Sequence, residues 1–284
     1  MKQKNILKLT AAAFAIIGTG TLLFNAAAET ALASSAKRTQ TVPTSYQVSN
    51  DLEMIFQKPG ITEESGGIAN CQVSMDSLNT GTPADTDLTM EEAAEAGVRH
   101  LGNIFGVDLE GAYVYMMYNP GTVTFPRAFW SGDVLFEKKQ TPESTRWTFM
   151  VDAVTGELFN AGHGRQLDAN PPLGLDQALE KDCSQYKELA RKKTEECGLM
   201  DSPVDRVEYN CQGYSGNDPD IALDVIGENG EMINMSFSRY DQEFLGIITD
   251  TSLKISESAL ERIMKGEADD DDQIEKKTAV FEAP

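Results

Sequence analysis

Apolar and polar positions along the chain alternate between helix-like and strand-like patterns, and the same order of patterns occurs twice. In the first run, apolar residues recur at helical spacing from Leu88 to Phe105. Thr89 and Glu92 have the spacing of a capping box at the start of this helix, and Gly106 is suited to end it. Four strand patterns separated by turn residues follow. They cover residues 113–118, 128–136, 146–151 and 157–161.

The second run repeats this order with a helix pattern from Leu175 to Gly198. Its four strand patterns cover residues 204–211, 221–226, 231–237 and 244–248. A last short helix is predicted from Ser256 to Lys265. The repeat predicts an α+β fold of two tandem small modules, each with one helix packed on a roughly four-stranded antiparallel sheet. Because each module is near the lower size limit for an independent core, we expect the two to pack on one another.

The N-terminus has the pattern of a secretory signal peptide. Lys2, Lys4 and Lys8 precede an apolar run, and small residues follow up to Ala33. An uncleaved membrane anchor is the alternative, and both place the rest of the chain outside the cytoplasm. The predicted division begins with a signal peptide or anchor at 1–33 and a polar linker at 34–87 with its main apolar residues at 52–56. The linker is expected to contain a short ordered piece, a strand or turn that docks on the first module. Modules at 88–165 and 173–252 follow, and then a short helix with an acidic disordered tail at 253–284.

The charge balance limits the partners. The chain has a formal net charge of −21, which argues against nucleic acid because the phosphates would be repelled. It also disfavours direct adsorption to an anionic membrane, so contact with a membrane is expected only through the N-terminal segment if that segment is uncleaved. The balance permits a basic protein partner.

Four cysteines in an exported chain allow disulfides. Cys183 and Cys197 fall on one predicted helix about 21 Å apart, too far for a bond to one another. Cys211 lies on the next predicted strand and can pair with either Cys183 or Cys197. The alternative, which stays open, is that these three and Cys71 are buried free thiols.

The turn between the third and fourth strand patterns of the first run is the most informative motif. It reads Asp152-Ala-Val-Thr155-Gly156-Glu157. Gly156 supplies the positive φ of a tight hairpin, and Asp152 and Thr155 can bond the amides of the turn. With Trp147 and Phe149 before it, this stretch resembles the PepSY family of extracytoplasmic modules.

The counterpart in the second run is predicted at Asp224–Glu231, where Asn229 and Gly230 form a strong hairpin signal without the Asp-Ala-x-Thr-Gly wording. The PepSY resemblance implies a cystatin-like α+β fold. It also implies an inhibitory or chaperoning contact with a secreted peptidase, and no catalytic residues.

Candidate chemistry elsewhere is sparse. The histidines, His100 and His163, are far apart in sequence, and neither H-E-x-x-H nor G-x-S-x-G occurs. A Cys/His dyad could only be assembled in space, for example from Cys71 and His163. The loop around Asp218 is oxygen-rich and is a candidate for calcium, although it lacks the spacing of an EF-hand. We predict no cofactor and no catalytic residue.

The sequence therefore predicts an exported, non-enzymatic protein-binding or regulatory protein of the cell envelope, secreted or anchored at the outer face of the membrane. The expected partner is an extracytoplasmic protein, with a peptidase as the implied class, bound through a sheet edge or sheet face. The alternatives are an exported hydrolase with dispersed acids or a Cys/His site, and a membrane-tethered spacer.

Overall fold

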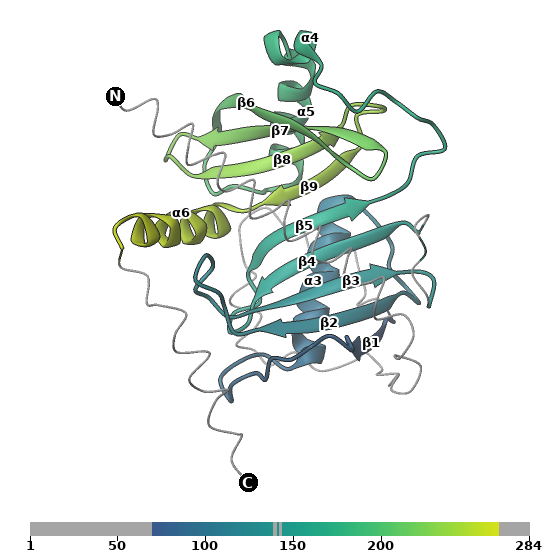
Figure 1. The fold of residues 1–284 in the computed structure, drawn as a ribbon, viewed down its shortest axis with the longest axis vertical. Helices are drawn as coiled ribbons and strands as arrows, with labels where there is room; N and C mark the ends of the chain where they lie inside the picture. Colours follow the sequence, from purple (N-terminus) through teal and green to yellow (C-terminus); the bar gives the residue numbers. More distant parts are fainter. Residues whose placement is uncertain (1–69, 139–140, 142–143, 267–284) are drawn as a thin grey trace.

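A computed structural model describes residues 70–138, 141 and 144–266, and Figure 1 shows their arrangement. The helices are α3 (Met90–Phe105), α4 (Gln177–Lys181), α5 (Ser184–Cys197) and α6 (Asp250–Met264). The strands are β1 (Gln72–Met75), β2 (Tyr113–Asn119), β3 (Phe129–Leu135), β4 (Arg146–Asp152), β5 (Leu158–Gly164), β6 (Val204–Ser215), β7 (Asp218–Gly227), β8 (Met232–Ser238) and β9 (Phe244–Ile248). The fold is α+β. None of the described helices is both long and apolar enough to cross a bilayer. The predicted signal or anchor, the apolar residues at 52–56 and most of the acidic tail lie outside the described residues.

The fold consists of two halves that share a central order of one helix followed by four strands. The first half contains β1, α3 and β2–β5, and the second contains α4, α5, β6–β9 and α6. In each half a helix ends at a left-handed glycine, Gly106 after α3 and Gly198 after α5. Four antiparallel strands, each paired with the next, then follow. The predicted order of one helix and four strands is therefore present twice.

The two halves share one sheet, which differs from the prediction of two separate four-stranded sheets. The strand order is β1-β2-β3-β4-β5-β9-β8-β7-β6. The last strands of the two halves, β5 and β9, pair in antiparallel fashion, and we call this pairing the seam. Each of these strands would otherwise leave an open edge with unpaired backbone groups, so their pairing completes the sheet. A Cβ added at Gly246 would lie only 2.9 Å from the carbonyl oxygen of Ala161, so glycine allows the close approach of the seam.

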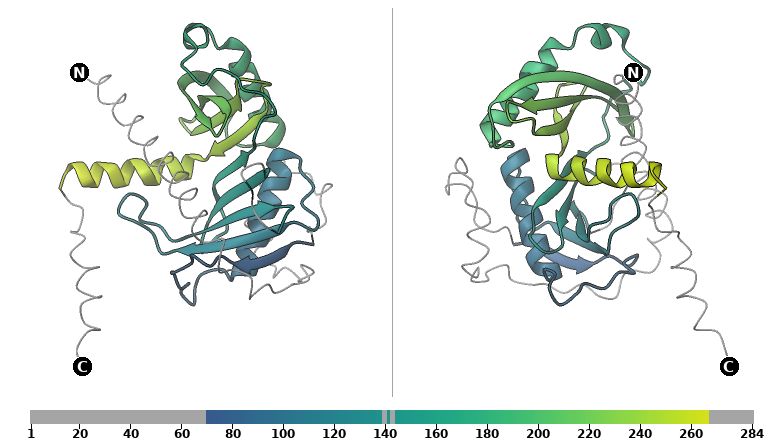
Figure 2. Two further views of the ribbon diagram at one scale, coloured as in Figure 1. Left: turned by 45° about the vertical axis from the view of Figure 1, so that its right-hand side comes forward. Right: turned by 90° about the vertical axis from the view of Figure 1, so that its left-hand side faces the viewer.

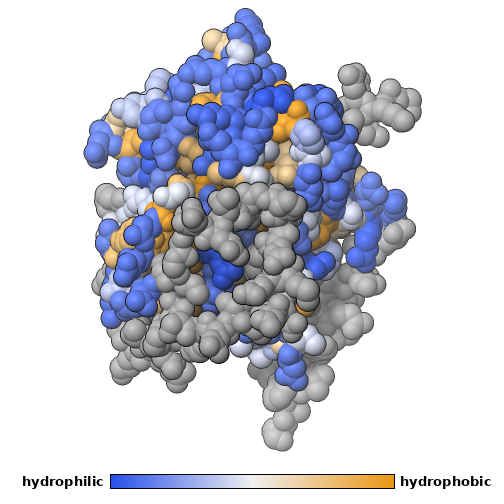
Figure 3. All heavy atoms as spheres, turned by 180° about the vertical axis from the view of Figure 1, so that it is seen from behind, coloured by the Kyte–Doolittle hydropathy of each residue, from blue (hydrophilic) through white to orange (hydrophobic). Residues whose placement is uncertain are grey.

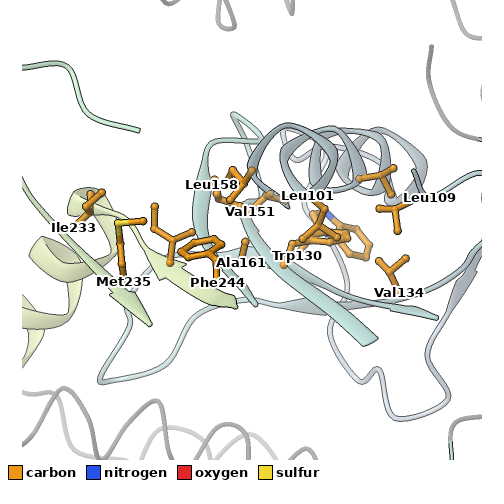
Figure 4. Close-up of a cluster of buried hydrophobic side chains, with 14 of the residues drawn as sticks. Leu101, Leu109, Trp130, Val134, Val151, Leu158, Ala161, Ile233, Met235 and Phe244 are labelled. Carbon is orange, nitrogen blue, oxygen red and sulfur yellow. The ribbon is translucent and has the colours of Figure 1, made fainter. Parts of the chain in front are cut away.

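Helices α3 and α5 cover the same face of the sheet, as Figure 2 shows, and α6 leaves the sheet after β9 in contact with β8 and β5. The buried apolar side chains form one cluster that continues across the seam. Figure 4 shows this cluster running from Leu101 and Trp130 in the first half to Phe244 and Met235 in the second. Burial of this continuous surface stabilises both halves together.

The layer between helix and sheet is filled differently in the two halves. In the first, the buried ring of Phe149 lies between α3 and the sheet, and a Cβ added at Gly97 or Gly132 would overlap it. In the second, the strand pair that corresponds to Gly132 and Phe149 is Leu223 and Met235. The first half thus combines one large ring with two glycines, and the second uses side chains of intermediate size.

Two further predictions need correction, and a third is confirmed. The helix predicted from Leu175 to Gly198 is interrupted, because Asp182 is extended and its carboxylate accepts a hydrogen bond from the amide of Ser184, which starts α5. The last helix begins at Asp250 rather than Ser256, because Thr249 caps it. The polar linker contains the short strand that was expected to dock on the first module, because β1 pairs in parallel with β2.

Candidate functional site: the two equivalent hairpins and the seam

The predicted motif turn forms the hairpin between β4 and β5. The amide of Asp152 donates to the carbonyl oxygen of Glu157 (2.8 Å), the amide of Gly156 donates to that of Asp152 (3.0 Å), and Gly156 has φ of 70°. The fully buried Asp152 carboxylate accepts hydrogen bonds from the amides of Val154 (2.9 Å) and Thr155 (2.8 Å). Its other oxygen lies 2.6 Å from Nε of Arg127. The Asp, Thr and Gly of the motif therefore build the turn, and Arg127 neutralises it.

Three contacts from other segments hold this hairpin in place. The amide of Leu88, which leads into α3, donates to the carbonyl oxygen of Ala153 (2.6 Å). His100 of α3 bonds the carbonyl oxygen of Gly156 through Nε2 (3.1 Å). Glu157 accepts a hydrogen bond from the hydroxyl of Thr251 in α6 (2.7 Å). Burial lowers the pKa of His100 to about 4, so the imidazole is neutral and structural here.

The hairpin between β8 and β9, Ser238–Glu243, has the same backbone. The amide of Ser238 donates to the carbonyl oxygen of Glu243 (2.8 Å), and the amide of Gln242 donates to that of Ser238 (3.0 Å). Gln242 has φ of 69°, matching Gly156, and among the described residues it is the sole non-glycine with positive φ. The prediction that Asp224–Glu231 is the counterpart is wrong, because that turn joins the second and third strands of its half. Only the final Glu is shared, so the wording of the motif could not reveal the equivalence. The position of the second hairpin between the third and fourth strand patterns of its half could have revealed the equivalence.

Charge at the second hairpin is arranged differently. The hydroxyl of Ser238 donates to the buried carboxylate of Asp218 (2.5 Å), and Arg165 bridges Asp218 (2.8 Å) and Asp241 (2.6 Å). The hydrogen bond from Arg165 holds the pKa of Asp241 below its usual value. Arg165 follows β5, so this ion pair also ties the first half to the second.

The loop around Asp218 was a candidate for calcium, but the Asp218 carboxylate accepts hydrogen bonds from protein side chains. Arg165 and Ser238 take up its two oxygens, and Asn217 beside it bonds the backbone of Leu167 and Ala169. Across residues 70–138, 141 and 144–266, no three His, Cys, Asp or Glu side chains are grouped to hold a metal ion.

The seam relates the two hairpins by an approximate two-fold axis. Counted from Asp152 and Ser238, Ala161 of β5 and Ile247 of β9 occupy the same position, and these two residues face one another in the ladder. The same patch of each half therefore pairs with itself, as at the interface of a symmetric dimer. Because β5 and β9 are antiparallel, the two hairpins lie at opposite ends of this strand pair.

Two partly buried acids on the face opposite α3 and α5 are also equivalent. Asp133 of β3 lies beside Thr148, and Asp224 of β7 lies beside Asn234. Asn210 and Asn234 donate to Asp224 (2.9 and 2.7 Å), whereas no described residue donates a hydrogen bond to the Asp133 carboxylate. Burial raises the pKa of both carboxyls, that of Asp133 to about 6.

The cysteines and His163 form no catalytic pair. Cys71 lies just before β1 and His163 lies in β5, four strand spacings apart, which is about 19 Å. Burial raises the pKa of the Cys71 thiol to about 11 and that of Cys211 to about 12, so both are protonated at neutral pH. His163 stacks on Trp147 with ring centroids 5.0 Å apart, and its ring nitrogens have no hydrogen-bond partner among the described residues.

All four cysteines are free thiols in the structure. A disulfide from Cys211 to Cys183 or Cys197 is therefore not formed, and it stays a prediction for oxidising conditions. Cys197, at the end of α5, instead contacts the carbonyl oxygen of Ile104 in α3 (4.0 Å).

The class that this arrangement defines is an α+β protein with two equivalent helix-and-hairpin halves joined into one sheet. No protein-family model matches the chain, and no curated protein matches it. Among solved structures, the chain is similar to the Bacillus megaterium YpeB C-terminal domain, with 12% sequence identity and a TM-score of 0.34 over 59% of this chain. The match covers 65% of that domain, which is less than two thirds of its length.

Proposed function

We propose that this protein is a non-enzymatic binding protein that acts outside the cytoplasm. In this proposal it is built from two PepSY-like, cystatin-like modules at 88–165 and 173–252. The side chains best suited to chemistry are engaged in structure: Asp152 by Arg127, Asp218 by Arg165 and Ser238, and His100 by Gly156. They support a scaffold more than a reaction centre.

The observation that carries the binding role is an exposed apolar patch at the second hairpin. It consists of Leu173, Leu175, Tyr214 and Tyr240, which are 38, 61, 62 and 54% exposed. The guanidinium of Arg239 joins their segments, since it donates to the carbonyl oxygen of Gly174 (3.0 Å) and to Oε1 of Gln212 (2.6 Å). Clustered aromatic and aliphatic side chains on a fixed backbone are typical of protein–protein contacts.

The surface of the second half fits a protein partner. The second half seen from behind in Figure 3 is mostly hydrophilic, with small apolar patches between the polar side chains. A polar surface around an apolar centre resembles the rim and core of a transient interface. The partner proposed is an extracytoplasmic protein, with a secreted peptidase as the class that the PepSY-like motif favours.

The test is a pull-down from the native extracellular and envelope fraction, with the exported chain as bait and mass spectrometry of the retained proteins. Tyr214→Ser with Tyr240→Ser should reduce retention of the partner about tenfold or more, since loss of two central aromatic anchors costs more than 1.4 kcal/mol. The matched control is Val123→Ser with Met264→Ser, which removes exposed apolar side chains elsewhere. Equal retention by both double variants would contradict the role of the patch. A hydrolytic activity of the pure protein that is lost on a single substitution would contradict the non-enzymatic role.

A further inference from the structure

A groove lies between α6 and the sheet, on the side of the second half away from the apolar patch. It has a volume of about 380 Å³, and the first turns of α6 and the hairpin between β7 and β8 form its walls. Its apolar lining consists of Ile226, Met232 and Leu253. Its charged lining consists of Asp205, Glu228, Asp250 and Glu257 with Arg206 and Lys254.

Most of these charges neutralise one another. Arg206 lies 2.8 Å from both Asp205 and Glu208, and Lys254 lies 2.5 Å from Asp250. Glu228 and Glu257 are exposed and form no ion pair with any described residue. The groove therefore combines an apolar floor with two uncompensated carboxylates.

We propose that this groove binds a lysine or arginine side chain of the partner protein, an inference that rests on the proposed binding function. The aliphatic stem of such a side chain lies against Ile226, Met232 and Leu253 while its charge reaches Glu228 and Glu257. The net charge of −21 attracts a basic segment over longer distances. The groove thus selects a side chain with a positive charge and a long aliphatic stem.

The approximate two-fold relation makes this groove a property of one half only. Helix α6 follows β9, whereas the equivalent strand β5 is followed by Arg165 and the connection to α4, so the first half has no helix in the corresponding place. The groove therefore belongs to the second half alone.

The test uses a fluorescein-labelled peptide, Gly-Ser-Lys-Gly-Lys-Gly-Ser, and the exported protein purified as the cell processes it. Glu228→Gln with Glu257→Gln should weaken peptide binding about tenfold by fluorescence anisotropy, because both ionic contacts are lost. The control, Glu188→Gln with Glu195→Gln on the exposed side of α5, changes the net charge equally and should alter binding less than about twofold. A peptide with diaminopropionic acid in place of lysine keeps the charge without the long stem and should also bind more weakly.

Equal weakening by the two double variants would overturn the groove proposal, because binding would then follow total charge. Equal affinity for the two peptides would overturn the role of the apolar floor. Failure of the proposed function is distinguishable, since it appears as the absence of a retained partner in the pull-down whatever the peptide result.

Discussion

The hairpins of the two halves have the same backbone and different side-chain chemistry. The Asp152 carboxylate accepts a hydrogen bond within the first turn and pairs with Arg127. At the second turn, the hydroxyl of Ser238 donates a hydrogen bond to the carboxylate of Asp218. Gly156 and Gln242 adopt the same left-handed conformation. The comparison shows that strand order and register specify this turn, and that several sets of side chains can satisfy it.

The layer between the helices and the sheet is also filled by different side chains in the two halves. One ring between two glycines fills the space in the first half, and Leu223 with Met235 fills it in the second. Cores tolerate such redistribution when total volume and pattern are kept. Substitutions can test how far the two arrangements of side chains are interchangeable.

The largest expected effect is at Phe149. Phe149→Ala should lower the free energy of unfolding by about 3–5 kcal/mol, because it leaves a cavity between α3 and the sheet. Urea denaturation followed by far-ultraviolet circular dichroism measures this change. A loss below about 1 kcal/mol would contradict the central place of this ring.

A swap of core residues sharpens the same comparison. Gly132→Leu alone should destabilise by about 3 kcal/mol through overlap with the ring, and adding Phe149→Met should restore part of that loss. This double variant copies the pair found at Leu223 and Met235. Strictly additive losses would show that the two layers are not equivalent.

The next effect separates the two hairpins. Asp152→Ala should cost about 3 kcal/mol, because two turn amides and Arg127 lose a buried charged partner. Ser238→Ala should cost about 1 kcal/mol, since Asp218 keeps its bond to Arg165. Thermal unfolding of the two variants under one buffer condition gives the ranking, and the reverse order would refute this account of the turns.

The pH dependence of stability tests the two partly buried acids, Asp133 and Asp224. Because burial raises the pKa of Asp133 to about 6, its folded carboxyl binds a proton more tightly than the unfolded one. The free energy of unfolding should therefore fall as pH rises from about 4 to about 6, by at most about 1.4 kcal/mol per pH unit. Asp133→Asn should flatten this part of the profile, and an unchanged slope would count against the buried carboxyl. Asp224→Asn should flatten it less, because Asn210 and Asn234 already offset part of the burial.

The smallest effects concern the left-handed position. Gly156→Gln should destabilise by about 1 kcal/mol, and Gln242→Gly should be neutral or stabilise by up to about 1 kcal/mol, because a side chain is strained at positive φ. Chemical denaturation of the two variants measures both changes. Effects of the same sign and size would argue against equivalent turns.

Much of the fold could be predicted from local patterns. The capping box of Thr89 and Glu92, the helix stop at Gly106 and the strands of both halves lie within a few residues of their predicted places, because they depend on neighbouring residues. The seam could not be predicted, because no local pattern specifies which open edges pair. The interruption at Asp182 depends on a single side-chain hydrogen bond that is weaker than the helical periodicity around it.

The candidate site could be predicted from the sequence only where its residues act within one short segment. Asp152, Thr155 and Gly156 act within one turn, and their roles follow from residue type. Arg127 and the bonds to His100 and Thr251 come from distant segments. The second hairpin shares one residue with the first, so its equivalence appears only in its hydrogen bonds.

The most direct test of one continuous sheet is to compare two signals during urea unfolding. Both tryptophans of the chain, Trp130 and Trp147, lie in the first half, so their fluorescence reports on that half while circular dichroism reports on both. The two transitions should coincide in the wild-type protein, and Gly246→Val at the seam should separate them. Two separate transitions in the wild-type protein would contradict the account, because each half would then fold without the other.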